Sequence, residues 1–305
     1  MSNNLETLQK QIKSGEDLAS IVKTMKALAA TSVQQYEKAV ESLDDYYETV
    51  EMGLSVVLTS KEEQVQARRQ DQHSPILLVI FGSDHGLAGH FNEQIVHFAL
   101  EEYWQEEGRE FPQNRYIACV GEQVFTRVTA AGHHVAEHFG VPVSTAGITV
   151  AVQTLLARIE GWRDRDGVQQ VLLLYNRPLA GATFASRVET LLPVDLSSLR
   201  KQRVEWQSRS LPTYTIPAPQ LLSELLRQYF FVSLYRAFAF SLAAENASRL
   251  AAMQAAEKNI DERLEELTMH YQQERQTAIT EEILDIISGF KALRRKNEGI
   301  ETIPQ

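Results

Sequence analysis

The chain has 305 residues, of which 44% are hydrophobic, and a formal net charge of −10. This length can hold two ordinary domains, and the acidic charge argues against nucleic acid as a partner, because its phosphates would repel the chain. The single cysteine, Cys119, excludes an internal disulfide framework and is typical of a reducing compartment. No apolar run approaches the roughly 20 residues of a membrane span, and the amino terminus lacks the pattern of a signal peptide.

The first predicted element is a long helix over residues 1–60. Apolar side chains recur along it at alternating steps of three and four, which is the spacing of a coiled-coil seam. This seam consists of Leu18, Val22, Met25, Ala29, Val33, Tyr36, Val40, Leu43, Tyr47, Val50, Leu54 and Val57. We therefore expect the helix to pair with a second one.

The middle of the chain has a different pattern. A polar segment at residues 61–74 is predicted as a linker, and three short apolar runs that follow it are predicted as buried strands. These runs are Ile76–Phe81, Tyr116–Val120 and Val171–Tyr175, with a looser strand at 183–191 expected at a sheet edge, and helix-like segments at 92–107, 122–131 and 150–162. Strands that alternate with helices predict a Rossmann-like α/β domain over residues 75–217.

A second long helix is predicted over residues 218–293, followed by a tail at 294–305. No glycine or proline occurs between Gln220 and Ser288, so this stretch alone would be about 100 Å long as a helix. It carries a seam of its own, formed by Met253, Glu257, Ile260, Leu264, Leu267, Tyr271, Glu274 and Ala278. A helix of that length extends well beyond a small domain.

The two long helices should pair antiparallel, because both are joined to the α/β domain at one end. The fold class expected is thus α/β, with a long antiparallel coiled coil of amino- and carboxy-terminal helices and the α/β domain inserted between them. In the expected register residue i faces roughly residue 275 minus i, which places Met25 beside Arg249 and Leu250. Residues beyond 274 then have no partner in the chain, although Ile279, Ile283 and Ile286 continue an apolar stripe there. Either another protein covers this stripe, or the end folds back on the domain.

Two other patterns could indicate chemistry. The glycine-containing loop at 82–89 follows a strand, where α/β folds bind phosphates, but its spacing matches neither G-x-G-x-x-G nor a P-loop. A structural turn is favoured over a nucleotide site. His133, His134 and His138 lack a clear carboxylate or thiolate that would complete a metal site, so a surface cluster is favoured. We expect no catalytic site, cofactor or metal.

Four segments resemble the gamma subunit family of F-type ATP synthases. The last helix contains RQTAITEEILDIISG at 275–289, similar to the family pattern RQ-x-x-IT-x-E-x-x-EI-x-x-G. The first helix contains IVKTMKALAA at 21–30, similar to ITKAMKMVAA. The loop SDHGLAGHFN at 83–92 resembles SDRGLCGGFN, and RLAAM at 249–253 resembles RM-x-AM. The segments follow the family's order and span nearly the whole chain.

The resemblance implies a noncatalytic rotor shaft that couples transmembrane ion flow to ATP synthesis or hydrolysis. It implies as partners the catalytic and noncatalytic subunits of the ATPase ring, a small epsilon-type companion subunit and the ion-carrying membrane ring. The location implied is peripheral, on the cytoplasmic face of a bacterial or archaeal plasma membrane. The residues carried over fall into three sets: shaft–ring coupling by Met25, Arg249, Gln276, Thr280 and Glu282; a carboxy-terminal bearing of Ile279, Ile283 and Ile286; and the family loop with Ser83, Asp84, Gly86, Gly89 and Asn92.

The chain also departs from the family pattern. His85, Ala88 and His90 replace an arginine, a cysteine and a glycine of the loop, and 246–248 differs from the more usual EHAA-like run. Thr31-Ser32 stands where the family usually has a small residue and a lysine. These departures leave open a diverged, alternative F-type complex. Two other classes also stay open from the residues alone: an enzyme built on the α/β domain with a coiled-coil dimerisation arm, and a coiled-coil scaffold.

Overall fold

The computed structural model describes residues 2–59, 74–108, 110–179, 183–194 and 213–298. The chain divides into two compact units, which we call the α/β part (residues 27–252) and the terminal part (residues 1–26 with 253–305). Nearly all of the linker expected at 61–74, and the end of the tail expected at 294–305, lie outside the described residues.

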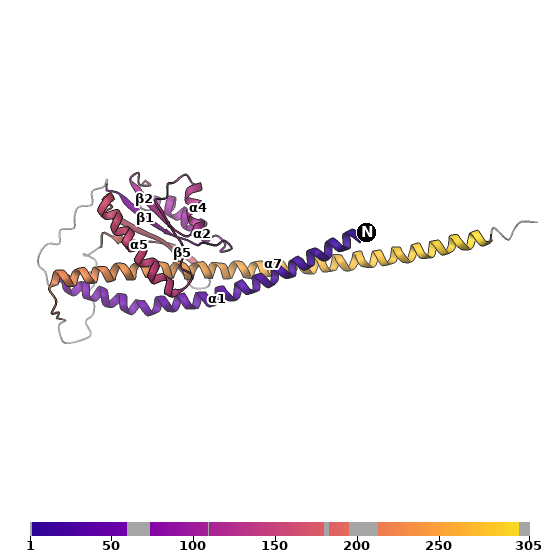
Figure 1. Cartoon of the computed structure of the whole chain (residues 1–305), viewed down its shortest axis with the longest axis horizontal. Coiled ribbons are helices and arrows are strands. Elements are labelled where there is room, and N and C mark those ends of the chain that lie inside the picture. Colours follow the sequence, from indigo (N-terminus) through magenta and orange to yellow (C-terminus); the bar gives the residue numbers. More distant parts are fainter. Residues whose placement is uncertain (1, 60–73, 109, 180–182, 195–212, 299–305) are drawn as a thin grey trace, which may run out of the picture. The chain divides into compact units, whose positions relative to one another are not determined.

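Two long helices dominate the chain, as expected (Figure 1). Helix α1 spans Ser2–Thr59, and helix α7 spans Ala218–Glu298, so that α7 continues past residue 293, where the tail was expected to begin. Within the α/β part they run antiparallel: the Tyr46 hydroxyl donates a 3.0 Å hydrogen bond to Gln228, and Gly53 packs against Leu225. Pro219 is accommodated in the first turn of α7, where no backbone N–H is needed.

The α/β part contains a five-stranded sheet in the order β3-β2-β1-β4-β5. Strands β1 (Ile76–Phe81), β2 (Arg115–Val120), β3 (Glu137–Phe139) and β4 (Gln170–Pro178) are parallel, and β5 (Phe184–Leu192) pairs antiparallel with β4 at the edge. The predicted strands and the edge position of 183–191 are confirmed. Strand β3 was not predicted, because it is short and two of its three residues are polar.

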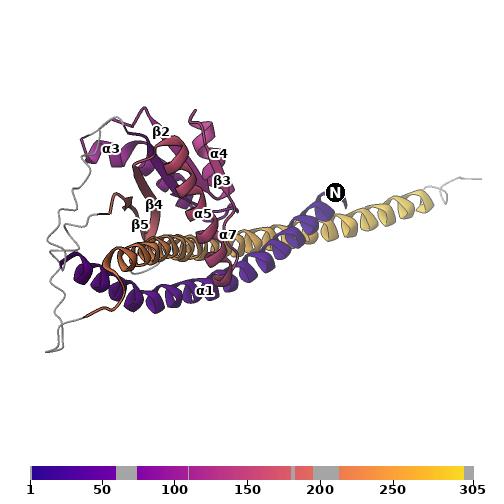
Figure 2. The same ribbon diagram turned by 60° about the vertical axis from the view of Figure 1, so that its left-hand side comes forward.

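Helices cover both faces of this sheet. On one face Leu78 and Ile80 pack against α2 (Phe91–His97), the π-helical turn η1 (Phe98–Glu102), α3 (Tyr103–Glu106) and α4 (Glu122–Ala130). On the other face Leu77, Val79 and Phe81 pack against α5 (Thr145–Asp166) and against the long helices (Figure 2). The continuous apolar runs of β1 and β4 follow from this two-sided burial, which parallel strands require.

Helix α5 is longer at both ends than the segment predicted at 150–162. Its amino end is capped by Ser144, whose hydroxyl accepts a 3.3 Å hydrogen bond from the Gly147 N–H. Its carboxy end is Gly167, whose φ of 69° is a left-handed conformation that glycine adopts without a steric penalty. The apolar pattern identified the buried face, whereas the two caps set the length.

The long helices are fixed to the sheet by aromatic and charged side chains as well as by apolar ones. The Arg236 guanidinium of α7 lies 4.3 Å from the ring centroid of Tyr47 on α1, and its Nε is 3.3 Å from an Asp44 oxygen. Phe238 of α7 packs edge-on against Phe81 of β1, with 4.9 Å between ring centroids. These contacts make the segments of α1 and α7 that belong to the α/β part members of the same core as the sheet.

Candidate functional site

The family loop joins β1 to α2 and is closed by hydrogen bonds between its own ends. The Asn92 side chain accepts a 3.0 Å hydrogen bond from the Ser83 N–H and donates one of 2.8 Å to the Ser83 hydroxyl oxygen. The Ser83 hydroxyl in turn donates to the His85 carbonyl at 2.8 Å. Both side chains are buried. Ser83 and Asn92 thus fix the shape of the loop.

Asp84 connects the loop to two neighbouring segments. Its carboxylate accepts hydrogen bonds from the Glu122 N–H at the start of α4, at 3.1 Å, and from the Val141 N–H, at 2.9 Å. A carboxylate at a helix amino terminus is favoured by the helix dipole. The polar groups of Ser83, Asp84 and Asn92 are therefore engaged within the fold, which supports the structural-turn interpretation of this loop.

Two residues of the loop have left-handed backbone. Gly89 has φ 55° and Leu87, which is largely exposed, has φ 64°, an uncommon conformation for a residue with a side chain. Gly86 has open space around it. Gly121 lies outside the loop but approaches it so closely that a Cβ there would lie 2.8 Å from the Ser83 backbone.

Helix α7 fills the position at which doubly wound folds usually bind a ligand, next to the carboxyl end of β1. Ala88 and Phe91 pack against Ala244 of α7 and against Phe184 of β5. The Ser248 hydroxyl donates a 2.6 Å hydrogen bond to the Ala88 carbonyl. Two segments singled out from the sequence, the loop at 83–92 and the helix around 249, are thereby in contact within the α/β part.

Arg249 lies one residue beyond this contact and is paired within its own helix. Its Nη2 donates a 2.7 Å hydrogen bond to Glu245 Oε1, and the Arg249 and Glu245 side chains are only 13% and 8% exposed. Burial raises the pKa of the Glu245 carboxyl above its ordinary value, against the opposing effect of the Arg249 guanidinium. Glu245 and Ser248 were not identified from the sequence; a charged residue one turn before Arg249, in an otherwise apolar stretch, was the available signal.

Asn176, at the carboxyl end of β4, also holds the family loop in place and was not identified from the sequence. Its fully buried side chain donates a 3.0 Å hydrogen bond to the Phe91 carbonyl and accepts one of 2.8 Å from the Ser186 hydroxyl. Asn176 thereby ties the end of the family loop to the two strands at the sheet edge. A single polar residue at the end of an apolar strand gives little indication of such a role.

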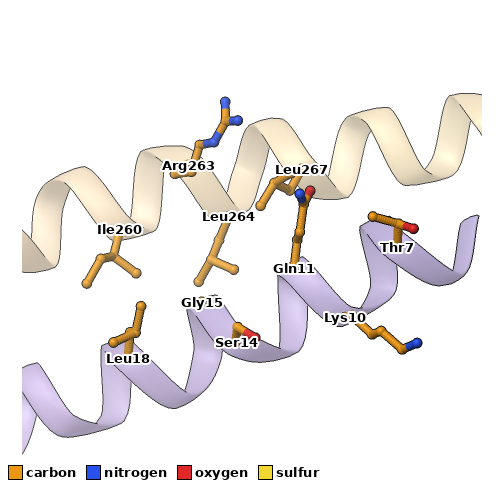
Figure 3. Close-up of a pocket in the computed structure, with 10 residues that line it drawn as sticks. All are labelled: Thr7, Lys10, Gln11, Ser14, Gly15, Leu18, Ile260, Arg263, Leu264 and Leu267. Atoms are coloured by element: carbon orange, nitrogen blue, oxygen red, sulfur yellow. The ribbon is translucent and has the colours of Figure 1, made fainter. Parts of the chain in front are cut away.

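In the terminal part, α1 and α7 pair antiparallel along the predicted α7 seam, from the buried Met253 to the half-buried Ala278. Lys26 of α1 forms an ion pair with Glu257 of α7. Figure 3 shows Gly15 directly beneath Leu264, and a Cβ on Gly15 would lie 2.7 Å from Leu264 Cδ2. The two helices approach closely here, beside an open groove of about 440 Å³.

Two details of the predicted pairing differ in the structure. The expected register, with residue i opposite roughly residue 275 minus i, agrees with the Tyr46–Gln228 hydrogen bond in the α/β part. In the terminal part Leu264, rather than residue 260, lies opposite Gly15, about one helical turn later. Leu18 is 53% exposed and lies outside the seam, which runs instead through Ala19, Gly15, Ile12, Leu8 and Leu5. The reason is steric, because the small residues Gly15 and Ala19 allow an approach that leucine does not. Met25 is half-buried; its facing of Arg249 stays a prediction, since the two residues belong to different parts.

The carboxy-terminal stripe is exposed. Ile279, Ile283 and Ile286 are 47%, 51% and 63% exposed, and Leu284 and Ile287 are exposed as well. The polar residues assigned to coupling, Gln276, Thr280 and Glu282, are also exposed, and the Thr280 hydroxyl donates to the Gln276 carbonyl at 2.8 Å. Polar and apolar candidates thus share the same turns of α7.

Two of the three clustered histidines contact other side chains. His133 Nδ1 lies 3.1 Å from Arg115 Nη2, and His138 stacks on the Phe125 ring. Within the described residues no group of three histidine, cysteine or acidic side chains could hold a metal ion. Among the residues that the structure describes, no helix has both the length and the apolar character needed to cross a membrane.

Known proteins resemble this chain along almost its whole length. A family model described as ATP synthase matches residues 4–293. The chain belongs to the gamma subunit family of F-type ATP synthases. It is 25% identical to an ATP synthase gamma chain of Ruminiclostridium cellulolyticum, over 96% of this chain and 100% of the relative, and 28% identical to one of Geotalea uraniireducens, over 95% and 99%.

A solved structure shows the same fold. The chain is similar to one in the Euglena gracilis mitochondrial ATP synthase, solved as OSCP/F1/c-ring in rotational state 3, with a TM-score of 0.65, 17% identity and coverage of 100% of this chain and 98% of the other. As a gamma chain, the protein is a noncatalytic central-stalk subunit of the complex. The gamma-family segments at 83–92 and 249–253 therefore lie on the central stalk.

Proposed function

We propose that this gamma chain is the shaft that transmits rotation between a membrane-embedded ion-carrying ring and the catalytic ring of an F-type ATP synthase. The observation that carries the proposal is the family match over residues 4–293, which includes both long helices and the α/β domain. A shaft without threefold symmetry presents a different surface to each catalytic site. Such differential contacts can bias each site between open and closed states.

The coupling contacts are assigned to Met25, Arg249, Gln276, Thr280 and Glu282. Support for the last three comes from their exposure on α7, where a surrounding ring could reach them. Support for Arg249 comes from its position one residue after Ser248, whose hydroxyl is hydrogen-bonded to the family loop. Met25 is assigned from its family segment alone.

The bearing is assigned to Ile279, Ile283 and Ile286. Burial of each such side chain is worth about 1.5–3 kcal/mol, so three of them left at 47–63% exposure favour a partner that covers them. The catalytic and noncatalytic subunits of the ATPase ring are the proposed cover. A sleeve of this kind would hold the end of α7 while it turns.

The remaining partners are proposed to bind the α/β domain. The α/β domain, residues 75–217 in the proposed domain scheme, would rest on the ion-carrying ring beside an epsilon-type companion subunit. Support comes from the similar Euglena structure, which was solved as OSCP/F1/c-ring. The cytoplasmic face of a bacterial or archaeal plasma membrane is the proposed location.

Purification of the native complex from its host tests this function. We expect the chain to copurify with two larger ring subunits and a membrane ring, each identified by mass. ATP hydrolysis by the complex in sealed vesicles should drive ion uptake. Recovery of the chain as a homodimer without ring subunits would overturn the proposal.

A further inference from the structure

An unusual feature of α7 is a charged pair inside an apolar stretch. The residues from Ala237 to Ala244 are buried, and the core includes Phe238, Leu242 and Ala243. Glu245 follows directly and is itself buried, with Arg249 one turn further along. Isolated charges are costly to bury, so a pair kept at this depth needs a reason.

The geometry of the pair restricts the Arg249 side chain. Glu245 Oε1 accepts the 2.7 Å hydrogen bond from Nη2, and Nη1 lies 3.5 Å from Asn246 Oδ1. Glutamate four residues before arginine is the favourable order on a helix. A long arginine side chain that is held from two sides loses much of its rotamer freedom in advance of any contact with another protein.

Glu245, the other member of the pair, is surrounded by groups of the α/β part. Glu245 Oε2 is buried and has no hydrogen-bond partner among the described residues. The titratable groups near Glu245 are Arg249 on its own helix, Asp84 and His85 of the family loop, and the Tyr36 hydroxyl of α1. Ser248, between the two members of the pair, is bonded to the loop at Ala88. The turn that carries the pair is therefore anchored to the α/β domain.

We propose that Glu245 is a positioning residue that aims the Arg249 guanidinium at the catalytic ring. The inference rests on the proposed function, because it takes Arg249 as a coupling contact. Glu245 does not itself touch the ring. It holds the guanidinium in one direction, so that rotation of the shaft brings the charge to each catalytic subunit in the same geometry. Without Glu245 the side chain would swing and the contact would weaken.

A double-mutant cycle in the whole complex tests this role. Glu245→Met and Arg249→Met are made singly and together, because methionine keeps the length and the helix propensity while it removes the hydrogen bond. The measurement is the coupling ratio, the ions pumped per ATP hydrolysed, in vesicles with matched amounts of assembled complex. Each single variant should lower this ratio on the order of threefold, and the double variant should be no worse than Arg249→Met alone. Glu101→Met, which removes an exposed contact with His97, is the matched control and should keep the wild-type ratio.

The possible outcomes separate the two hypotheses. A wild-type ratio for Glu245→Met beside a lowered ratio for Arg249→Met overturns the positioning role, as does a double variant that shows the product of the two single losses. A wild-type ratio for Arg249→Met removes Arg249 from the proposed coupling site and the inference with it, while copurification still tests the shaft itself. If Glu245→Met does not assemble, the cycle is run with Glu245→Gln, and the same non-additivity decides.

Discussion

The Ser248 hydroxyl of α7 donates a 2.6 Å hydrogen bond to the Ala88 carbonyl, 160 residues away in the sequence. This bond joins the shaft helix to the loop that follows the first strand. Since Ser248 is buried, its loss would leave the Ala88 carbonyl without that donor. The contact explains how a loop of the α/β domain comes to lie beside Arg249.

Ser248→Ala should destabilise the chain by about 1–2 kcal/mol, because a buried hydrogen bond is lost and its acceptor stays buried. Urea unfolding of the purified chain, followed by circular dichroism, measures the change. Ser42→Ala is the control, since the Ser42 hydroxyl bonds to its own helix at Lys38 on an exposed surface. Equal changes for the two variants would contradict the role given to the Ser248 bond.

Cys119 should be unreactive in the native chain. Burial within β2 raises the pKa of its thiol to about 12, so the nucleophilic thiolate is scarce at pH 8. Because folding raises the pKa of this thiol, its protonated form favours the folded state. The contribution of Cys119 to stability is therefore complete below the unfolded pKa of 9.0 and is lost as the pH rises through about 12. Labelling with a thiol reagent at pH 8 should be slow in buffer and fast in urea. Fast labelling in both would show that the sheet core opens readily.

The register in the terminal part can be tested by crosslinking in a Cys119→Ala background. Gly15→Cys combined with Leu264→Cys should form an intramolecular disulfide, because a Cβ at position 15 would lie 2.7 Å from Leu264 Cδ2 and a disulfide needs Cα atoms within about 7 Å. Gly15→Cys with Ile260→Cys represents the register expected from the sequence and should crosslink less. Preferential crosslinking at 260, or dimers between chains, would contradict the observed pairing.

Replacement of Ile279, Ile283 and Ile286 together by serine should weaken assembly of the catalytic ring. These side chains are exposed in the chain alone, so their loss should leave the α/β domain folded. Pull-down of ring subunits by the variant, with circular dichroism of the free chain, measures both effects. Val143→Ser with Val150→Ser, which removes exposed apolar groups from the α/β domain, is the control. Undiminished assembly of the triple variant would remove the bearing assignment.

Glu282→Lys should permit assembly but lower the coupling between ATP hydrolysis and ion transport. Glu282 is exposed on α7, and reversal of its charge would change contacts with the ring that differ between rotational states. ATPase activity and ion pumping, measured together in reconstituted vesicles, should show hydrolysis retained with a reduced pumping yield. Glu101→Lys on the α/β domain provides the comparison. Normal coupling in Glu282→Lys would exclude this residue from the coupling set.

Much of the fold could be predicted from the sequence because its signals are local and periodic. Steps of three and four put the seam residues of both long helices, apart from Leu18, on one face whatever surrounds them. The run Ile76–Phe81 is apolar because β1 is buried on both faces. The four family segments likewise depend on residue order alone. For the same reason, the exposure of Ile279, Ile283 and Ile286 was expected from where the partner helix ends.

Only the tertiary structure decided the register of the helices and the composition of the site. Spacing along one helix says nothing about which turn of the other it meets; the close approach of Gly15 and Leu264 set that. The environment of Arg249 depends on Ala88, which the sheet topology brings to Ser248 from a distant segment. Glu245 gains its role in the same way, because the burial that holds it beside Arg249 comes from the packing of α7 within the α/β part.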